Sequence, residues 1–189
     1  MNVYDFDNTI YKGESGVDLF MYFLRRDPKL IGALPWAIGA ISDYKFSKMT
    51  LEDVMDKHAK VVEDYCRANL PDIPAVVSDF WDKHSHKIKS FYLRQRQDDD
   101  IVISACIDVV LAEICKRLNI KNYVGTEVDL DEYKLRSFCF RENKVKAFRT
   151  RYPDAVIDNF YTDSMNDTPM IEISRNAYLV KGDKIVKIK

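Results

Sequence analysis

Hydrophobic positions follow two different patterns along the chain. Between residues 16 and 97 they recur at helical spacing, and no run alternates as a strand does. In this stretch we expect a helix at 17–24, another opening at Thr50, and one long helix with apolar residues from 76 to 92 on one side. We expect the acidic run 98–100 to be a solvated boundary loop.

Outside that stretch, short β-branched runs alternate with helical patterns. Strands are expected at 101–103, 122–126, 159–162 and 177–180, and a hairpin between 128 and 140. Helices are expected at 108–118, from 144 and from 169. Such alternation predicts an α/β core with a parallel sheet covered on both faces. The domains expected are therefore a core of residues 1–15 and 98–189, with residues 16–97 inserted as an all-helical domain.

Residues 30–41 form an uncharged run of twelve residues. A membrane-spanning helix needs about 20 apolar residues, so this run is too short. Packing inside the helical domain is favoured, and contact with lipid or with an apolar substrate remains the alternative. His58 and His84 lie on apolar helical stripes, where a buried, hydrogen-bonded histidine is commoner than a catalytic one.

Composition narrows the classes of protein to which this chain can belong. The chain has 189 residues, 47% of them hydrophobic, and only six glycines and six prolines, which is not typical of disorder. The formal net charge of −1 provides no basic field for nucleic acid. Four cysteines without a C-x-x-C pair indicate free thiols in a reducing compartment. No signal peptide is evident, so a cytoplasmic location is expected; membrane association is not expected, although residues 30–41 leave it open.

Candidate chemistry begins where the first β-prone run meets two carboxylates, Asp5 and Asp7. Side chains alternate along a strand, so these two would point apart unless the strand ended between them. At the carboxyl edge of a parallel sheet, such a bend brings both carboxylates to one crevice. Two carboxylates so close together attract a hard cation. The alternative is an Asx-rich turn that caps a helix.

Four short motifs lie in order along the chain: Asp5–Thr9 (D-x-D-x-T), 101–105 (an apolar strand ending in Ser-Ala), Lys144, and 161–167, which contains D-S-x-x-D. Together they resemble the haloacid dehalogenase-like (HAD) phosphohydrolases, and most closely the phosphoserine-phosphatase-like subfamily. The resemblance implies a Rossmann-like sheet with the first motif on a central strand and the second and fourth motifs on its neighbours. It also implies that the helical insert is a C1-type cap.

The resemblance further implies a Mg²⁺-dependent phosphomonoester hydrolase. Asp5 would attack phosphorus and form an aspartyl-phosphate, and Asp7 would serve as general acid and then as general base. Asp5, Asp163 and the main-chain carbonyl of Asp7 would hold Mg²⁺, and Asp167 would orient metal-bound water. The alternative for 163–167 is an ordinary helix N-terminus, where acids are favourable.

Further residues are assigned to substrate and charge balance. The Ser104 side chain and the Ala105 backbone N–H would hold phosphate oxygens, and Lys144, preferred over Lys146, would balance charge on Asp5. Glu14 would reach over the pocket and contact substrate; the alternative is a solvated loop carboxylate.

The expected substrate is a small phosphorylated metabolite. Family members that dehalogenate lack the second acid, so Asp7 indicates phosphoryl transfer. Two alternatives remain: the same chemistry on a lipid phosphate or other apolar substrate, and a catalytically silent interaction module, which is disfavoured because no catalytic position is lost. One departure from the family is the segment 138–141, which is bulkier than the glycine-containing approach to the family's lysine.

Overall fold

The structure is a computed structural model that describes residues 1–27, 60, 64, 67–68, 72–132 and 134–189. The uncharged run 30–41, the helix expected from Thr50 and His58 lie outside the described residues. In the described part of the chain, no helix combines the length and the apolar character needed to cross a membrane.

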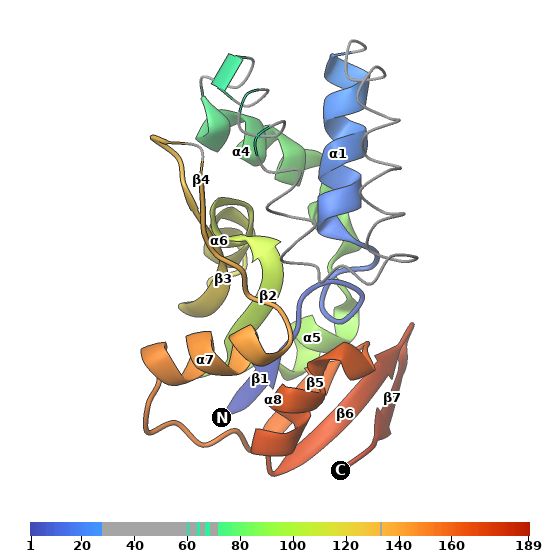
Figure 1. Ribbon diagram of the computed structural model, residues 1–189. Coiled ribbons are helices and arrows are strands. Elements are labelled where there is room, and N and C mark those ends of the chain that lie inside the picture. Colours follow the sequence, from blue (N-terminus) through green and yellow to red (C-terminus); the bar gives the residue numbers. More distant parts are fainter. Residues whose placement is uncertain (28–59, 61–63, 65–66, 69–71, 133) are drawn as a thin grey trace, which may run out of the picture.

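A seven-stranded sheet forms the centre, in the order β4-β3-β2-β1-β5-β6-β7 (Figure 1). The strands are β1 (Asn2–Tyr4), β2 (Ile101–Ile107), β3 (Asn122–Asp129), β4 (Lys134–Ser137), β5 (Asn159–Thr162), β6 (Asn176–Lys181) and β7 (Lys184–Lys187). Strands β3, β2, β1, β5 and β6 run parallel, and the edge strands β4 and β7 pair antiparallel with their neighbours. The expected α/β fold is confirmed, and the first-motif strand β1 lies between β2 and β5.

Helices cover both faces of this sheet (Figure 1). One face packs against α7 (Glu142–Arg151) and α8 (Thr168–Ile173), and the other against α5 (Ser90–Gln95) and α6 (Asp108–Arg117). Successive strand residues point to opposite faces, so Val3 belongs to the first apolar cluster and Tyr4 to the second. The short, fully apolar strands of the sequence are explained by this double coverage.

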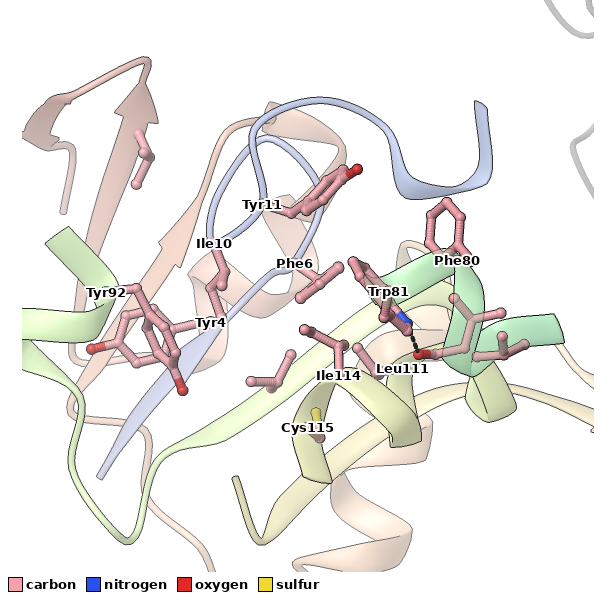
Figure 2. Packing of buried hydrophobic residues seen from close by; sticks show 14 of the residues in the cluster. Tyr4, Phe6, Ile10, Tyr11, Phe80, Trp81, Tyr92, Leu111, Ile114 and Cys115 are labelled. Carbon is pink, nitrogen blue, oxygen red and sulfur yellow. Dashed lines mark hydrogen bonds between the residues drawn. The ribbon is translucent and has the colours of Figure 1, made fainter. Parts of the chain in front are cut away.

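Two further helices, α1 (Ser15–Arg26) and α4 (Ile73–His84), lie beyond the carboxyl ends of the parallel strands (Figure 1). Figure 2 shows how α4 joins the core: Phe6 and Tyr11, from the loop after β1, pack beside Trp81 of α4. Trp81 is fully buried, and its Nε1 donates a hydrogen bond of 2.8 Å to the carbonyl of Val110 in α6. This contact ties α4 to the core.

The prediction of one long helix through residue 92 is wrong. Helix α4 ends at His84, a 3₁₀ turn, η2 (Ser85–Lys87), follows, and Ile88 is extended and forms an antiparallel bridge with Tyr11. The Lys89 N–H donates to the carbonyl of Ile10 at 2.8 Å, and the Lys12 N–H donates to the carbonyl of Lys87 at 2.9 Å. These backbone bonds fasten the returning chain to the loop after β1, and they require an extended segment in place of a helix.

The acidic run before β2 is only partly solvated, as Asp98 and Asp99 are exposed but Asp100 is 2% exposed. The Asp100 carboxylate accepts hydrogen bonds from the Asn2 side chain at 3.0 Å and from the Gln97 backbone N–H at 2.8 Å. Burial raises the pKa of Asp100, and these two donors oppose the rise. The prediction of a solvated loop fails here because Asp100 joins β2 directly and is packed beside the start of β1.

Candidate active site

The candidate site begins at the carboxyl end of β1, which stops at Tyr4, one residue before Asp5. The Asp5 backbone N–H still donates to the carbonyl of Tyr161 in β5 at 2.8 Å. The chain then turns, because the N–H groups of Ile10 and Tyr11 both donate to the carbonyl of Phe6, at 2.8 and 2.9 Å. The strand thus ends at Tyr4, just before the position between Asp5 and Asp7 that the sequence predicted, and both carboxylates can reach the same side.

A cavity of about 160 Å³ lies at this edge of the sheet. All eight residues assigned from the sequence line it: Asp5, Asp7, Glu14, Ser104, Ala105, Lys144, Asp163 and Asp167. Three lining residues had no assigned role: Phe140, Ser164 and Asn166. The carboxyl ends of β1, β2 and β5 bring the motifs together, as expected for neighbouring parallel strands.

Lys144 projects from the first turn of α7 into the cavity and is almost fully buried. Its Nζ lies 2.7 Å from Asp5 Oδ1 and 3.0 Å from Asp167 Oδ2. Burial alone lowers the pKa of Lys144, but the two carboxylates reverse this and raise it, so the ammonium stays charged. Lys146, the rival lysine, lies outside the cavity and donates to the Asn143 side chain at 3.2 Å.

Thr162, the last residue of β5, forms a hydrogen bond with the Asp167 carboxylate of this ion pair. Its hydroxyl donates to Asp167 Oδ2 at 2.8 Å and is fully buried. Sequence reasoning assigned no role to Thr162, although it lies within the fourth motif, 161–167. Asp167 is thus fixed by one hydroxyl and one ammonium.

The loop from Asp7 to α1 forms one wall of the cavity. The backbone N–H of Ser15, the first residue of α1, donates to Asp7 Oδ1 at 2.7 Å. The Asn8 side chain donates to Glu14 Oε1 at 2.5 Å, and Asn8 itself has φ +54°. Gly13, with φ +113°, lets the loop double back so that its carbonyl accepts from the Asn8 N–H at 3.0 Å. Asp7 and Glu14 therefore share one rigid loop.

The opposite wall comes from β2, where Ser104 is 1% exposed. The Ser104 Oγ accepts a hydrogen bond of 3.0 Å from the backbone N–H of Cys106. The Ala105 carbonyl accepts one of 2.8 Å from the Thr126 hydroxyl. In β3, a Cβ at Gly125 would lie 2.9 Å from the Cys106 carbonyl, so only glycine allows the two strands to approach this closely.

Acidic groups outnumber the buried cation in this cavity. Burial raises the pKa of Asp5 to about 8; Lys144 opposes the rise, and the charges of Asp167 and Asp7 add to it. Burial likewise raises the pKa of Asp7, Glu14 and Asp163. An added cation would stabilise the ionised forms of these groups.

The donor chemistry fits a hard divalent cation, because carboxylate oxygens are the ligands that Mg²⁺ prefers. Among the described residues, no three His, Cys, Asp or Glu side chains already converge as a metal site. The fit therefore rests on the oxygen donors that line the cavity and on their excess negative charge.

Comparisons with known proteins agree with this geometry. The sequence model of the haloacid dehalogenase-like hydrolases matches residues 3–172. A search of curated proteins finds no match. Among solved structures, a protein of unknown function from Bordetella pertussis Tohama I has 18% identity and a TM-score of 0.74, with 94% of this chain and 87% of that chain covered.

Two further structures share the fold at lower similarity. A phosphoserine phosphohydrolase-like protein from Francisella tularensis subsp. tularensis SCHU S4 has 15% identity and a TM-score of 0.56, with 94% of this chain and 86% of that chain covered. A phospho-aspartyl intermediate analogue of phosphoserine phosphatase has 13% identity and a TM-score of 0.52, with 93% and 83% covered. At these identities the likeness shows the fold alone. The family match, which spans most of the chain, is what establishes membership: the protein belongs to the haloacid dehalogenase-like hydrolase family.

Proposed function

We propose that the protein is a Mg²⁺-dependent phosphomonoester hydrolase that acts on a small phosphorylated metabolite through an aspartyl-phosphate. The observation that carries this proposal is the contact of 2.7 Å between Lys144 Nζ and Asp5 Oδ1, inside a cavity that Asp7 also lines. The contact holds one carboxylate as a nucleophile beside a second acid. The phospho-aspartyl analogue of a phosphatase with the same fold supports the covalent step.

In the first half of the proposed reaction, an Asp5 oxygen bonds to phosphorus as the bond to the leaving oxygen breaks. Asp7 gives its proton to that leaving oxygen and so releases a neutral alcohol. The raised pKa of Asp7 suits this role, because the carboxyl holds its proton at higher pH than a solvated aspartate does. In the second half, Asp7 takes a proton from water as the water attacks phosphorus, which frees Asp5 and phosphate.

The remaining residues balance charge and orient the reacting groups. Lys144 keeps the Asp5 carboxylate in place and offsets negative charge on the transferring phosphoryl group. The Ser104 side chain and the Ala105 N–H are proposed to bind phosphate oxygens. Asp5, Asp163 and the Asp7 carbonyl would hold Mg²⁺, with Asp167 behind them orienting water; the ion supplies the positive charge that lets a carboxylate approach a phosphate.

We further propose that residues 16–97 act as a cap and that Glu14, just before it, contacts the part of the substrate beyond the phosphate. The cavity of about 160 Å³ favours a small substrate. Residues 30–41, which motivated a lipid phosphate, lie outside the described residues, so no observation here favours that alternative. A silent module is disfavoured because all the assigned residues meet in one cavity. A cytoplasmic location stays a prediction.

A hydrolysis screen tests the proposal. Purified protein with Mg²⁺ is assayed for phosphate release over a panel of phosphometabolites, lipid head-group phosphates and phenyl phosphate, with Asp5→Asn as the matched control. We expect Mg²⁺-dependent release that the control lacks by several orders of magnitude, because a neutral amide of similar shape is a poor nucleophile. Turnover retained in Asp5→Asn, or unaffected by a chelator, would overturn the proposal.

A further inference from the structure

Arg141 has an unusual backbone conformation directly before α7, the helix that carries Lys144. Its φ of +48° and ψ of −122° lie in a region that glycine adopts freely and other residues rarely adopt, because a Cβ meets the neighbouring peptide groups there. Strained non-glycine residues of this kind cluster at sites of function. The bulky approach to the motif lysine, noted in the sequence, thus places an arginine where the backbone suits glycine.

The Arg141 side chain lies at the edge of the acidic cavity. Its guanidinium carbon is 5.2 Å from the centre of the Phe140 ring, and Nη2 donates to Asn166 Oδ1 at 3.3 Å. Both Phe140 and Asn166 line the cavity, and Arg141 itself is exposed. Arginine has about five N–H donors, and the bond to Asn166 uses one of them. The stacked ring and this bond orient the guanidinium while leaving donors for a ligand.

The charges around the cavity define what such a ligand would be. Lys144 is buried and already engaged by Asp5 and Asp167, while Asp163 and Glu14 present further carboxylates. A second anionic group on a substrate would be repelled by these acids unless a cation stood at the edge. Arg141 supplies that cation, and its planar fork matches an oxyanion.

We propose that Arg141 is a specificity-determining residue that binds an oxyanion, such as a carboxylate, on the leaving group of the phosphate ester. This inference rests on the proposed phosphatase function. The guanidinium, held beside Phe140 and Asn166, would contact the leaving group at the edge of the cavity. Substrates with an anionic leaving group are therefore preferred over neutral ones.

The test compares phenyl phosphate with 3-carboxyphenyl phosphate, which differ by one carboxylate. Wild type, Arg141→Gln and Arg141→Lys are assayed on both; all three have a Cβ and so share the same backbone constraint. In Arg141→Gln we expect kcat/KM to fall at least about tenfold more on the carboxylated ester than on phenyl phosphate, chiefly through KM. Arg141→Lys should retain part of the preference, and added salt should weaken it in the wild type.

A second variant separates binding from folding. Arg141→Gly removes the Cβ, so it should raise the midpoint of thermal unfolding and yet lose the preference as Arg141→Gln does. A wild type that hydrolyses phenyl phosphate but shows the same kcat/KM ratio between the esters as Arg141→Gln overturns this inference and leaves the proposed function standing. A wild type that hydrolyses neither ester, nor any member of the panel, overturns the proposed function and this inference with it.

Discussion

The loop after β1 separates two environments that are built from neighbouring residues. Phe6 and Ile10 point into the apolar cluster with Trp81 (Figure 2), whereas Asp5 and Asp7 line the acidic cavity. The apolar side is stabilised by burying large side chains, each worth about 1.5–3 kcal/mol. On the acidic side, burial raises the pKa of the carboxyls and so opposes their ionisation.

This difference shows how the site accommodates its buried negative charge. The acidic side gains little from its own contacts, because Lys144 compensates only part of the negative charge. The apolar side holds the same loop in place through backbone bonds and aromatic packing. Stability and chemistry are thus supplied by opposite sides of one short segment, and substitutions on the two sides should have different consequences.

The largest expected effect follows from removing the buried cation. Lys144→Met should lower kcat/KM by about a hundredfold to a thousandfold, as loss of one preorganised charge or donor does. It should also reduce the free energy of unfolding by about 3–5 kcal/mol at pH 8, and by less at pH 5, where the Asp5 carboxyl, whose pKa burial raises, holds its proton. Phosphate release and denaturant titration measure these changes. Lys146→Met, at the exposed lysine two residues on, is the matched control and should change neither.

On the apolar side, Trp81→Ala should reduce the free energy of unfolding by about 3–5 kcal/mol, since it empties a fully buried indole site and leaves the Val110 carbonyl without its donor. Urea denaturation followed by circular dichroism measures the loss. Val17→Ala, at a side chain 59% exposed on α1, should stay within about 0.5 kcal/mol of wild type. Equal losses in the two variants would contradict the assigned packing.

The two sides should also differ in their response to pH and metal. Burial raises the pKa of Asp5 from its ordinary value of 3.8 to about 8, so between these values the folded state holds the extra proton. The free energy of unfolding should therefore fall as pH rises from 5 to 8, by up to about 1.4 kcal/mol per pH unit for this group. Mg²⁺ should flatten this slope and release protons on binding at pH 7, which calorimetry in buffers of different ionisation enthalpy measures. A slope of the opposite sign would refute the assignment.

The smallest effect concerns the Thr9 hydroxyl, the one buried side-chain polar atom without a hydrogen-bond partner in the described part of the chain. Thr9→Val keeps the shape and removes an unsatisfied group, so the free energy of unfolding should hold or rise by up to about 1 kcal/mol. Thr162→Val is the matched comparison. It removes the donor to Asp167 and should lower the free energy of unfolding and raise KM or lower kcat. Thermal unfolding of the two variants measures the change in their free energies of unfolding relative to wild type.

Much of the site was predictable because parallel strands end at one edge. The residues assigned at 5–7, 104–105, 144 and 163–167 were grouped by the four motifs and the family resemblance; in the structure, the ends of β1, β2 and β5 and the first turn of α7 bring them together. The α/β fold followed from the alternation of β-branched runs with amphipathic helices. This alternation is a local pattern, which the sequence carries directly.

Other features depended on tertiary contacts. Apolar residues at 80, 81, 88, 91 and 92 keep helical spacing, yet they lie on separate elements because Ile88 forms an isolated antiparallel bridge with Tyr11. Asp100 is buried by its partners in β1 and at Gln97, which no charge pattern reveals. Phe140, Arg141 and Asn166 meet only because two loops close over the same cavity.

Covalent trapping tests the central claim, that Asp5 is the nucleophile, most directly. Enzyme turning over a radiolabelled phosphate ester from the panel is quenched in acid, and its peptides are mapped for label. The account predicts phosphate on the peptide that contains Asp5, discharged by hydroxylamine as an acyl phosphate is, and no label in Asp5→Asn. Label on another residue, or turnover without any labelled protein at substrate saturation, would contradict it.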